Sequence, residues 1–240
     1  MQIVSQPRVN AATSVSPWLN TDSGNPISLG HSISCTVERH FSEHEHLYLE
    51  GEVQSHIYLV TSGVIGTYKL LADGRRQICA FAYPGDILGV ECAQRHLNNA
   101  EALSDAVVRS IPSVAIDKLI MTEPGFGQAL LRITAKELAG TREQLMSLGR
   151  KTAIEKLATF LLSIAQRNVP ADGQGVQIDL PMKRCEIADY LGLTVETVSR
   201  NFTRLKASGV IRLLSSNRIQ VQDLKLLEAM AGGEDTFRLH

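Results

Sequence analysis

Short runs of β-branched and aromatic residues, separated by Gly, Asp and Asn, follow one another along the first half of the chain. Runs of this kind with turn residues between them are typical of β-strands. The clearest runs cover residues 57–60, 64–68, 78–82 and 107–111, and hairpin turns are expected at Gly63 and at 72–74. Many short strands at close spacing predict an antiparallel sandwich or jelly roll, which we place at residues 27–124.

The pattern becomes helical after Pro124 and stays so for about forty residues. Leu131, Leu138 and Leu145 recur every seven residues, as the seam of a coiled coil does. This spacing predicts a long dimerisation helix over residues 125–149, with these leucines in the interface between two copies. Polar residues interrupt the seam, so a helix packed on its own domain is the alternative. A second helix is expected at residues 153–165.

Two short amphipathic helices joined by a tight turn are predicted between residues 184 and 206. Gly192 provides the turn, and Thr194 stands where it can cap the second helix. One face of this second helix is apolar and can be buried against the first helix: Val198, Phe202 and Leu205. Four polar residues at i, i+3, i+4 and i+7 share the opposite face: Glu196, Ser199, Arg200 and Thr203.

A helix with an apolar back and a front of Glu, Ser and Arg is suited to reading base edges in the major groove of DNA. An Arg can donate two hydrogen bonds to guanine O6 and N7, and a Glu can accept one from cytosine N4. An ordinary surface helix pair is the alternative, since short amphipathic patterns are common. The combination of turn, cap, spacing and polar residue types favours the DNA-reading interpretation.

A β-hairpin is predicted after this helix pair, because two short β-type runs at 210–214 and 218–221 flank Ser215-Ser216-Asn217. It would form the wing of a winged helix-turn-helix domain at residues 150–233. From the wing, Arg212 and Arg218 could reach a phosphate backbone, although solvated strand residues would show the same pattern. A β domain followed by a mainly helical one predicts an α+β fold.

The formal net charge of −1 over 240 residues is unusual for a DNA-binding protein. This charge is unevenly distributed, however. Residues 1–149 contain 11 Lys and Arg against 15 Asp and Glu, whereas residues 150–240 contain 13 against 10. Within 181–222 the count is 7 against 3. The basic surplus therefore surrounds the predicted reading helix, where DNA phosphates require it.

The remaining composition indicates a cytoplasmic protein with no membrane partner. No apolar run is long enough to span a membrane, and the N-terminus lacks the order of a signal peptide. Residues 1–26 are rich in Ser, Asn, Thr and Pro without periodicity, which predicts a flexible arm. The four cysteines are scattered, which argues against a disulfide framework or a structural zinc site.

The order of jelly roll, long helix and winged helix-turn-helix resembles the CRP/FNR superfamily of bacterial transcription regulators. The stretch at 187–200, Ile-Ala-Asp-Tyr-Leu-Gly-Leu-Thr-Val-Glu-Thr-Val-Ser-Arg, is similar to the FNR/FixK branch and most of all to FixK. In that branch a Glu, a Ser and an Arg in this arrangement read a TTGAT-type half-site, which implies this role for Glu196, Ser199 and Arg200. The CRP branch has Arg where this chain has Val195.

The resemblance implies a homodimer that binds a palindrome on double-stranded DNA and acts, together with RNA polymerase, as an activator of low-oxygen or nitrogen-fixation-type genes. Other residues around the predicted reading helix are expected to contact the DNA backbone: Lys183, Arg184, Thr194, Thr197, Thr203, Lys206 and Arg218.

Two ligands of the superfamily are not expected here. Its cyclic-nucleotide pocket uses Gly-Glu and then Arg-Ser, whereas this chain has Gly-Val-Glu-Cys at 89–92 and Asn-Ala-Glu-Ala-Leu at 99–103. An acidic residue in place of the Arg would repel the phosphate of cyclic AMP. An iron–sulfur cluster of the FNR type needs a tight N-terminal group of cysteines, and only Cys35 lies near the start. We expect no cofactor; a ligand- or heme-gated regulator of the same fold is the alternative.

His44-Glu45-His46, followed by Glu50, has the spacing of the first metal motif of cupin enzymes, which share the jelly-roll fold. The glycines that frame the cupin motif are absent, and its second part is not recognisable. The sequence therefore predicts no metal site and no enzyme, and a cupin-like metalloenzyme is the rival interpretation from another class.

Cys185 is a candidate redox site, because it lies in the first turn of a predicted helix beside Lys183 and Arg184. A helix N-terminus and nearby cations favour the reactive thiolate. Oxidation there would add negative charge close to DNA phosphates and lower the affinity for DNA. A small packed residue without a redox role is the alternative.

Overall fold

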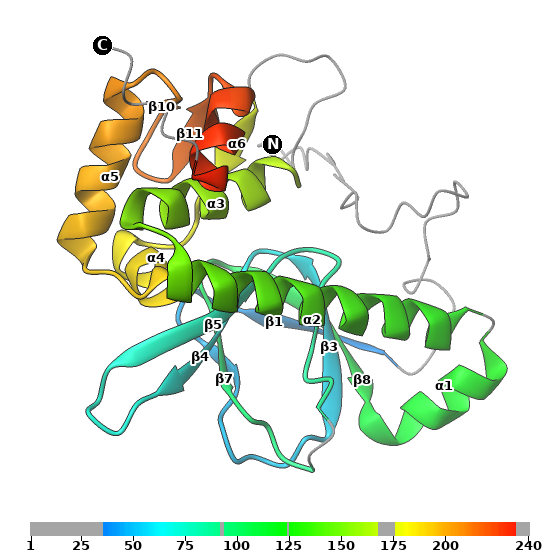
Figure 1. The fold of residues 1–240 in the computed structure, drawn as a ribbon. Helices are drawn as coiled ribbons and strands as arrows, with labels where there is room; N and C mark the ends of the chain where they lie inside the picture. The colour runs from blue at the N-terminus through cyan, green and yellow to red at the C-terminus, as the bar shows by residue number, and fades with distance from the viewer. Residues whose placement is uncertain (1–35, 92–93, 124, 168–175, 234–240) are drawn as a thin grey trace, which may run out of the picture.

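The computed structural model describes residues 36–91, 94–123, 125–167 and 176–233. Its first domain contains two four-stranded antiparallel sheets, with strand orders β1-β8-β3-β6 and β2-β7-β4-β5 (Figure 1). The strands are β1 (Val37–Phe41), β2 (His46–Tyr48), β3 (His56–Ser62), β4 (Ile65–Leu70), β5 (Arg76–Ala82), β6 (Ile87–Leu88), β7 (Asn99–Ala102) and β8 (Ala106–Pro112). Tyr58, Val60, Ile65 and Val108 are buried in a core that draws on both sheets. The expected β sandwich is confirmed.

The turn at Gly63 differs from the prediction. It joins β3 to β4, and these strands belong to different sheets, so the turn is a crossing between sheets and not a hairpin. Gly63 has a φ of 77°, and a side chain there would collide with the backbone of Asp105 and Ala106. The glycine therefore marks a close approach of two chain segments. The turn at 72–74 does close a hairpin, since β4 pairs with β5.

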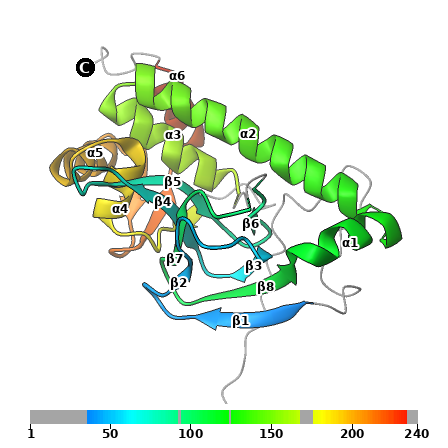
Figure 2. The same ribbon diagram turned by 90° about the horizontal axis from the view of Figure 1, so that it is seen from below.

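Helices follow the last strand. A single 3₁₀ turn, η2 (Ser113–Ala115), and α1 (Ile116–Thr122) occupy the end of the segment assigned to the β domain. The long helix α2 (Phe126–Arg150) then runs past the β domain, as Figures 1 and 2 show. Phe126 and Ala129 of α2 share an apolar cluster with Ile57 and Ile111 of the first sheet. This packing fixes the first part of α2 on the β domain.

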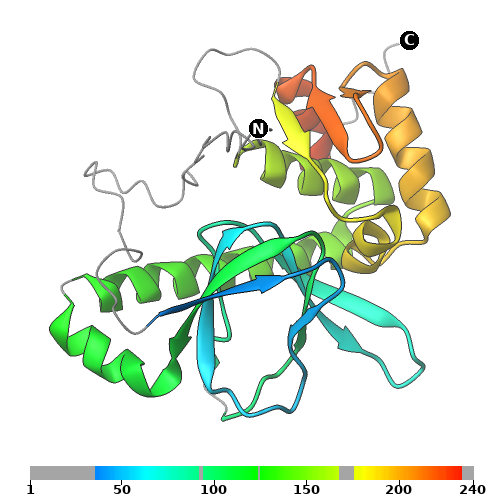
Figure 3. The ribbon, with the colours of Figure 1, turned by 180° about the vertical axis from the view of Figure 1, so that it is seen from behind.

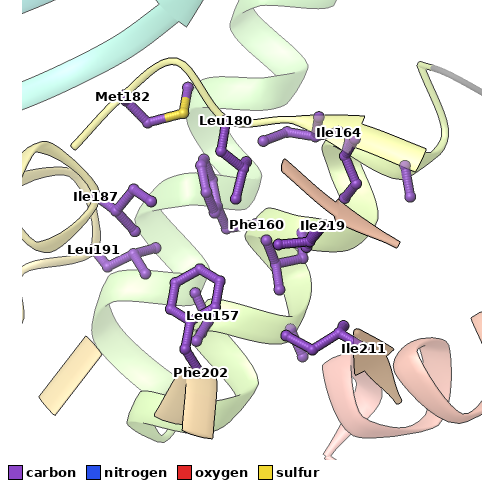
Figure 4. Packing of buried hydrophobic residues seen from close by; sticks show 14 of the residues in the cluster. Leu157, Phe160, Ile164, Leu180, Met182, Ile187, Leu191, Phe202, Ile211 and Ile219 are labelled. Atoms are coloured by element: carbon purple, nitrogen blue, oxygen red, sulfur yellow. The ribbon is translucent and has the colours of Figure 1, made fainter. Parts of the chain in front are cut away.

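The C-terminal domain combines helices with a three-stranded sheet of order β10-β11-β9 (Figure 3). Its elements are α3 (Ala153–Ala165), β9 (Gln177–Asp179), α4 (Arg184–Leu191), α5 (Val195–Ala207), β10 (Ile211–Leu213), β11 (Arg218–Val221) and α6 (Leu224–Gly232). The core between them contains side chains from every layer, among them Leu157, Ile187, Phe202 and Ile219 (Figure 4). Helix α3 has the bounds that its apolar pattern predicts, and β10 and β11 form the expected wing hairpin.

The two domains share one apolar cluster. Ile78 and Phe81 of β5 belong to the same buried group as the core of the C-terminal domain. Tyr190 of α4 packs between two phenylalanines, with ring centroids 4.9 Å from Phe81 and 5.6 Å from Phe160. The C-terminal domain thus packs against part of the second sheet, mainly through β5. The predicted arm at 1–26 lies outside the described residues.

Candidate nucleic-acid interface

The turn between α4 and α5 is built by its own residues. Gly192 ends α4 in the left-handed conformation, with φ 62° and ψ 43°, where an L side chain is strained. At the start of α5 the Thr194 hydroxyl accepts a hydrogen bond from the backbone N–H of Thr197, at 3.2 Å. At the start of α4 the Glu186 carboxylate accepts one from the backbone N–H of Lys183. The expected stop and cap signals are therefore present.

The apolar face of α5 anchors the helix in the domain. Val198, Phe202 and Leu205 are all buried, as their spacing predicts. They belong to one cluster with Leu191 of α4 and Leu157 of α3, and Figure 4 shows Phe202 beside Leu157. Because α4 and α5 pack on each other and on α3, the two helices hold a fixed mutual geometry.

The opposite side is the polar face of α5, and all four of its residues are exposed: Glu196, Ser199, Arg200 and Thr203. Hydrogen bonds from its own backbone N–H and from the Thr194 hydroxyl, together with the nearby Arg200 guanidinium, lower the pKa of Glu196. The carboxylate is therefore ionised at neutral pH and acts as an acceptor. An acceptor and a guanidinium donor lie one helical turn apart on this face.

Threonine hydroxyls hold part of this surface in place. The Thr197 hydroxyl bonds to that of Thr194 at 3.0 Å and accepts from Arg200 Nη2 at 3.4 Å. The Thr203 hydroxyl donates to the Ser199 backbone carbonyl at 3.1 Å. Of the expected phosphate-contacting threonines, Thr194 and Thr197 thus lie beside the polar face and Thr203 lies on it, each with a local partner.

Lys183, at the N-terminus of α4, contacts the β domain. Its ammonium lies 3.0 Å from Glu43 Oε1 and 2.8 Å from His44 Nε2. The hydrogen bond to Glu43 raises the pKa of Lys183 and lowers that of Glu43. A phosphate that binds Lys183 must therefore share or displace this contact.

Two of the other expected backbone-contacting cations also have partners within the chain. The Arg184 guanidinium carbon lies 3.4 Å from the centre of the Phe202 ring, and burial lowers the pKa of this group. On the wing, Arg218 Nε lies 2.6 Å from Asp179 Oδ1, and both side chains are exposed. Lys206, in the last turn of α5, is exposed.

Cys185 is an exposed free cysteine and lies in the first turn of α4, as the sequence predicts. The two neighbouring cations point to partners of their own: Lys183 to Glu43, and Arg184 to the Phe202 ring. Its redox role stays a prediction. Cys79 of β5 is the other exposed free cysteine among the described residues, and partial desolvation of its sulfur by neighbouring atoms raises its pKa.

The histidines of the cupin-like motif have partners other than a metal. His44 Nδ1 lies 2.7 Å from Glu101 Oε1, and His46 Nε2 lies 2.9 Å from the Tyr68 hydroxyl. Glu50 pairs with Lys69 at 2.9 Å. Within the described part of the chain, no group of three His, Cys, Asp or Glu side chains is arranged to hold a metal ion.

Arg76 of β5, at the boundary between the two domains, is not predicted from the sequence as a functional residue. It contacts Glu101 of β7 together with Glu186 and Asp189 of α4. Arg76 and Asp189 are 113 positions apart, and Arg76 lies in no motif recognised from the sequence. Only the three-dimensional contact of α4 with β5 brings these residues together.

Comparison with known proteins decides between a DNA-binding regulator and a metalloenzyme. Residues 155–230 match the model of the Crp-like helix-turn-helix domain, and residues 38–123 match that of the cyclic nucleotide-binding domain. The chain is 39% identical to the nitrogen fixation regulation protein FixK of Bradyrhizobium diazoefficiens, over 80% of this chain and 81% of that protein. The chain belongs to the CRP/FNR superfamily of transcription regulators.

Other members of the superfamily agree with its placement in the FNR/FixK branch. The transcriptional activatory protein AadR of Rhodopseudomonas palustris is 38% identical over 78% of each chain. The solved structure of FixK2 from Bradyrhizobium japonicum superposes with a TM-score of 0.75 at 37% identity, covering 81% of this chain and 96% of that one.

Membership in this superfamily confirms the predicted DNA-binding regulator and the prediction that the chain is not an enzyme. The cupin-like metalloenzyme is therefore ruled out as an interpretation. The described helices include none with the length and apolarity that a membrane crossing needs.

Proposed function

We propose that this regulator is a FixK-type activator that reads TTGAT-type half-sites through Glu196, Ser199 and Arg200. The observation that carries the proposal is the polar face of α5, which is exposed while the opposite face is locked into the domain core. An ionised Glu and an Arg on one exposed helical face supply an acceptor for cytosine and a two-pronged donor for guanine. The similarity to the nitrogen fixation regulation protein FixK supports target genes of the nitrogen-fixation type.

The regulator binds its palindrome as a homodimer through α2. Leu131, Leu138 and Leu145 are 70%, 51% and 70% exposed on one side of this helix. When a partner covers large apolar side chains on one stripe of a surface helix, the free energy of the assembly falls. A second copy presents the same stripe, and a two-fold axis between the helices matches a palindromic operator.

Neither cyclic AMP nor an iron–sulfur cluster gates this regulator. Glu101 belongs to the stretch that corresponds to the nucleotide-binding cassette, and its side chain is buried between Arg76, 3.1 Å away, and His44. A cyclic phosphate at this carboxylate would meet like charge. The activity of the regulator is instead set by how much of it the cell synthesises. It acts in the cytoplasm, together with RNA polymerase at the promoter.

Selection of preferred duplexes from a random DNA pool by the purified full chain tests the proposal. Two inverted TTGAT-type half-sites should emerge, and a gel shift on the selected duplex should be lost when both half-sites are scrambled. Selection of an unrelated sequence, or of no sequence, would contradict the proposed specificity.

A further inference from the structure

The contact between α4 and the β domain centres on one arginine. Arg76 of β5 uses three different nitrogens for three carboxylates: Nη1 lies 3.1 Å from Glu101, Nη2 lies 3.7 Å from Glu186, and Nε lies 3.3 Å from Asp189. Glu101 belongs to the β domain, and the other two carboxylates belong to α4. We call Arg76, Glu101, Glu186 and Asp189 the Arg76 cluster.

The cluster is sensitive to the orientation of α4. The side chains of Glu186 and Glu101 are only 3% and 9% exposed, and that of Arg76 is 24% exposed. A guanidinium is a planar fork with fixed donor directions, so it meets several carboxylates in only one relative arrangement. If α4 turned or slid on β5 while the interface stayed dry, a buried carboxylate would lose its cation, which is strongly unfavourable.

Two neighbouring contacts hold α4 in the same place, one from β5 and one from α2. Gln77 Nε2 of β5 donates to the Asp189 backbone carbonyl at 2.5 Å. Gln144 Nε2 of α2 donates to the Tyr190 backbone carbonyl at 2.8 Å. Helix α4 is therefore tied both to the β domain and to the long helix.

The docked arrangement leaves the polar face of α5 uncovered, since Glu196, Ser199 and Arg200 are all exposed in it. Because α5 shares a core with α4, it takes its orientation from α4. The contact with the β domain thus leaves the polar face accessible, and it sets the direction in which this face points.

We propose that Arg76 is a positioning residue that fixes the orientation of α5 relative to α2 and thereby selects the spacing between the two half-sites. This inference rests on the proposed function, a dimer on a palindrome. Two half-sites are read together only if the recognition helices are about 34 Å apart and correctly turned. One extra base pair rotates a half-site by roughly 35°, which a rigidly held α5 cannot follow.

Affinity for palindromes of different spacing tests this role. The full-length wild type and the variants Arg76→Ala and Asp189→Asn are titrated with the duplex selected by the wild type, and with duplexes one base pair longer or shorter between the half-sites. Arg75→Ala is the matched control, because Arg75 is adjacent but pairs with Asp73 in the exposed hairpin turn. Thermal unfolding of each variant is followed in parallel.

We expect the wild type and Arg75→Ala to discriminate strongly between spacings. Arg76→Ala should bind the selected duplex more weakly, and its preference over the altered spacings should fall by roughly fivefold or more, about 1 kcal/mol. Asp189→Asn removes one negative charge from the cluster but keeps an oxygen that can accept from Arg76. Because this side chain is one third exposed, the variant should fold and show a smaller change in the same direction.

Three outcomes would overturn the inference. Equal loss of affinity at every spacing would mean that Arg76 only stabilises the fold. Tighter binding by Arg76→Ala would mean that the contact restrains DNA binding. If Arg76→Ala does not fold, an unchanged spacing preference in Asp189→Asn decides against the proposal. Failure of the wild type to bind any palindrome would instead refute the proposed function itself.

Discussion

Among the residues on the polar face of α5, Arg200 has the chemistry that separates one base pair from another most strongly. Arg200→Ala should cost about 1–3 kcal/mol of discrimination at the guanine position. Arg200→Lys retains the positive charge but loses the planar fork, so it should keep affinity for unrelated DNA while losing the preference for guanine. Gel shifts on the selected duplex and on a duplex with that guanine replaced measure both effects. Unchanged preference in Arg200→Ala would contradict the assignment.

Cys185 leads to a second prediction for a single residue. Its thiol is exposed at the N-terminus of α4, so oxidation to a sulfinate or sulfonate would place negative charge where DNA phosphates are expected. Peroxide should lower the operator affinity of the wild type and leave Cys185→Ser unaffected. After the same peroxide treatment, Cys79→Ser should lose operator affinity as the wild type does, because it keeps Cys185 and the replaced cysteine lies on β5. An equal loss in Cys185→Ser would rule out this redox role.

At the scale of elements, replacing two different glycines by Ala should change the stability of the protein in opposite directions. Gly192→Ala forces a side chain into the left-handed conformation that ends α4 and should destabilise the protein by about 1 kcal/mol. Gly140 lies inside α2, and a Cβ there would meet nothing within 4 Å. Gly140→Ala should therefore stabilise the protein by roughly 0.5–1 kcal/mol. Denaturant unfolding measures both changes, and a shift of the same sign in both variants would contradict the turn assignment.

The elements also show which features local sequence can predict. The stop at Gly192, the cap at Thr194 and the bounds of α3 depend on neighbouring residues, and the structure has them where they are expected. The turn at Gly63 depends instead on which strands pair, and its glycine serves a crossing between sheets. Such pairing is decided by contacts between distant segments, which no local pattern contains.

At the scale of the whole molecule, the contacts that join the two domains fix how one lies on the other. The C-terminal domain docks through α4 on β5, while α2 connects both domains. Arg76, the residue at the centre of this docking, lies in an ordinary β-strand in sequence terms. The polar face of α5 could be predicted from the sequence. The contacts that orient it could not, because they form only where α4 docks on β5.

The apolar stripe on α2 carries the last prediction. Covering one Leu is worth about 2 kcal/mol, and a two-fold dimer contains each position twice, so Leu138→Asp should raise the dimer dissociation constant roughly a thousandfold. Leu70→Asp is the control, because Leu70 is also a largely exposed leucine, at 60%, but lies at the end of β4 and not on α2. Sedimentation should show a monomer only for Leu138→Asp, with loss of binding to the palindrome. A Leu138→Asp protein that remained dimeric would place the interface elsewhere on the molecule.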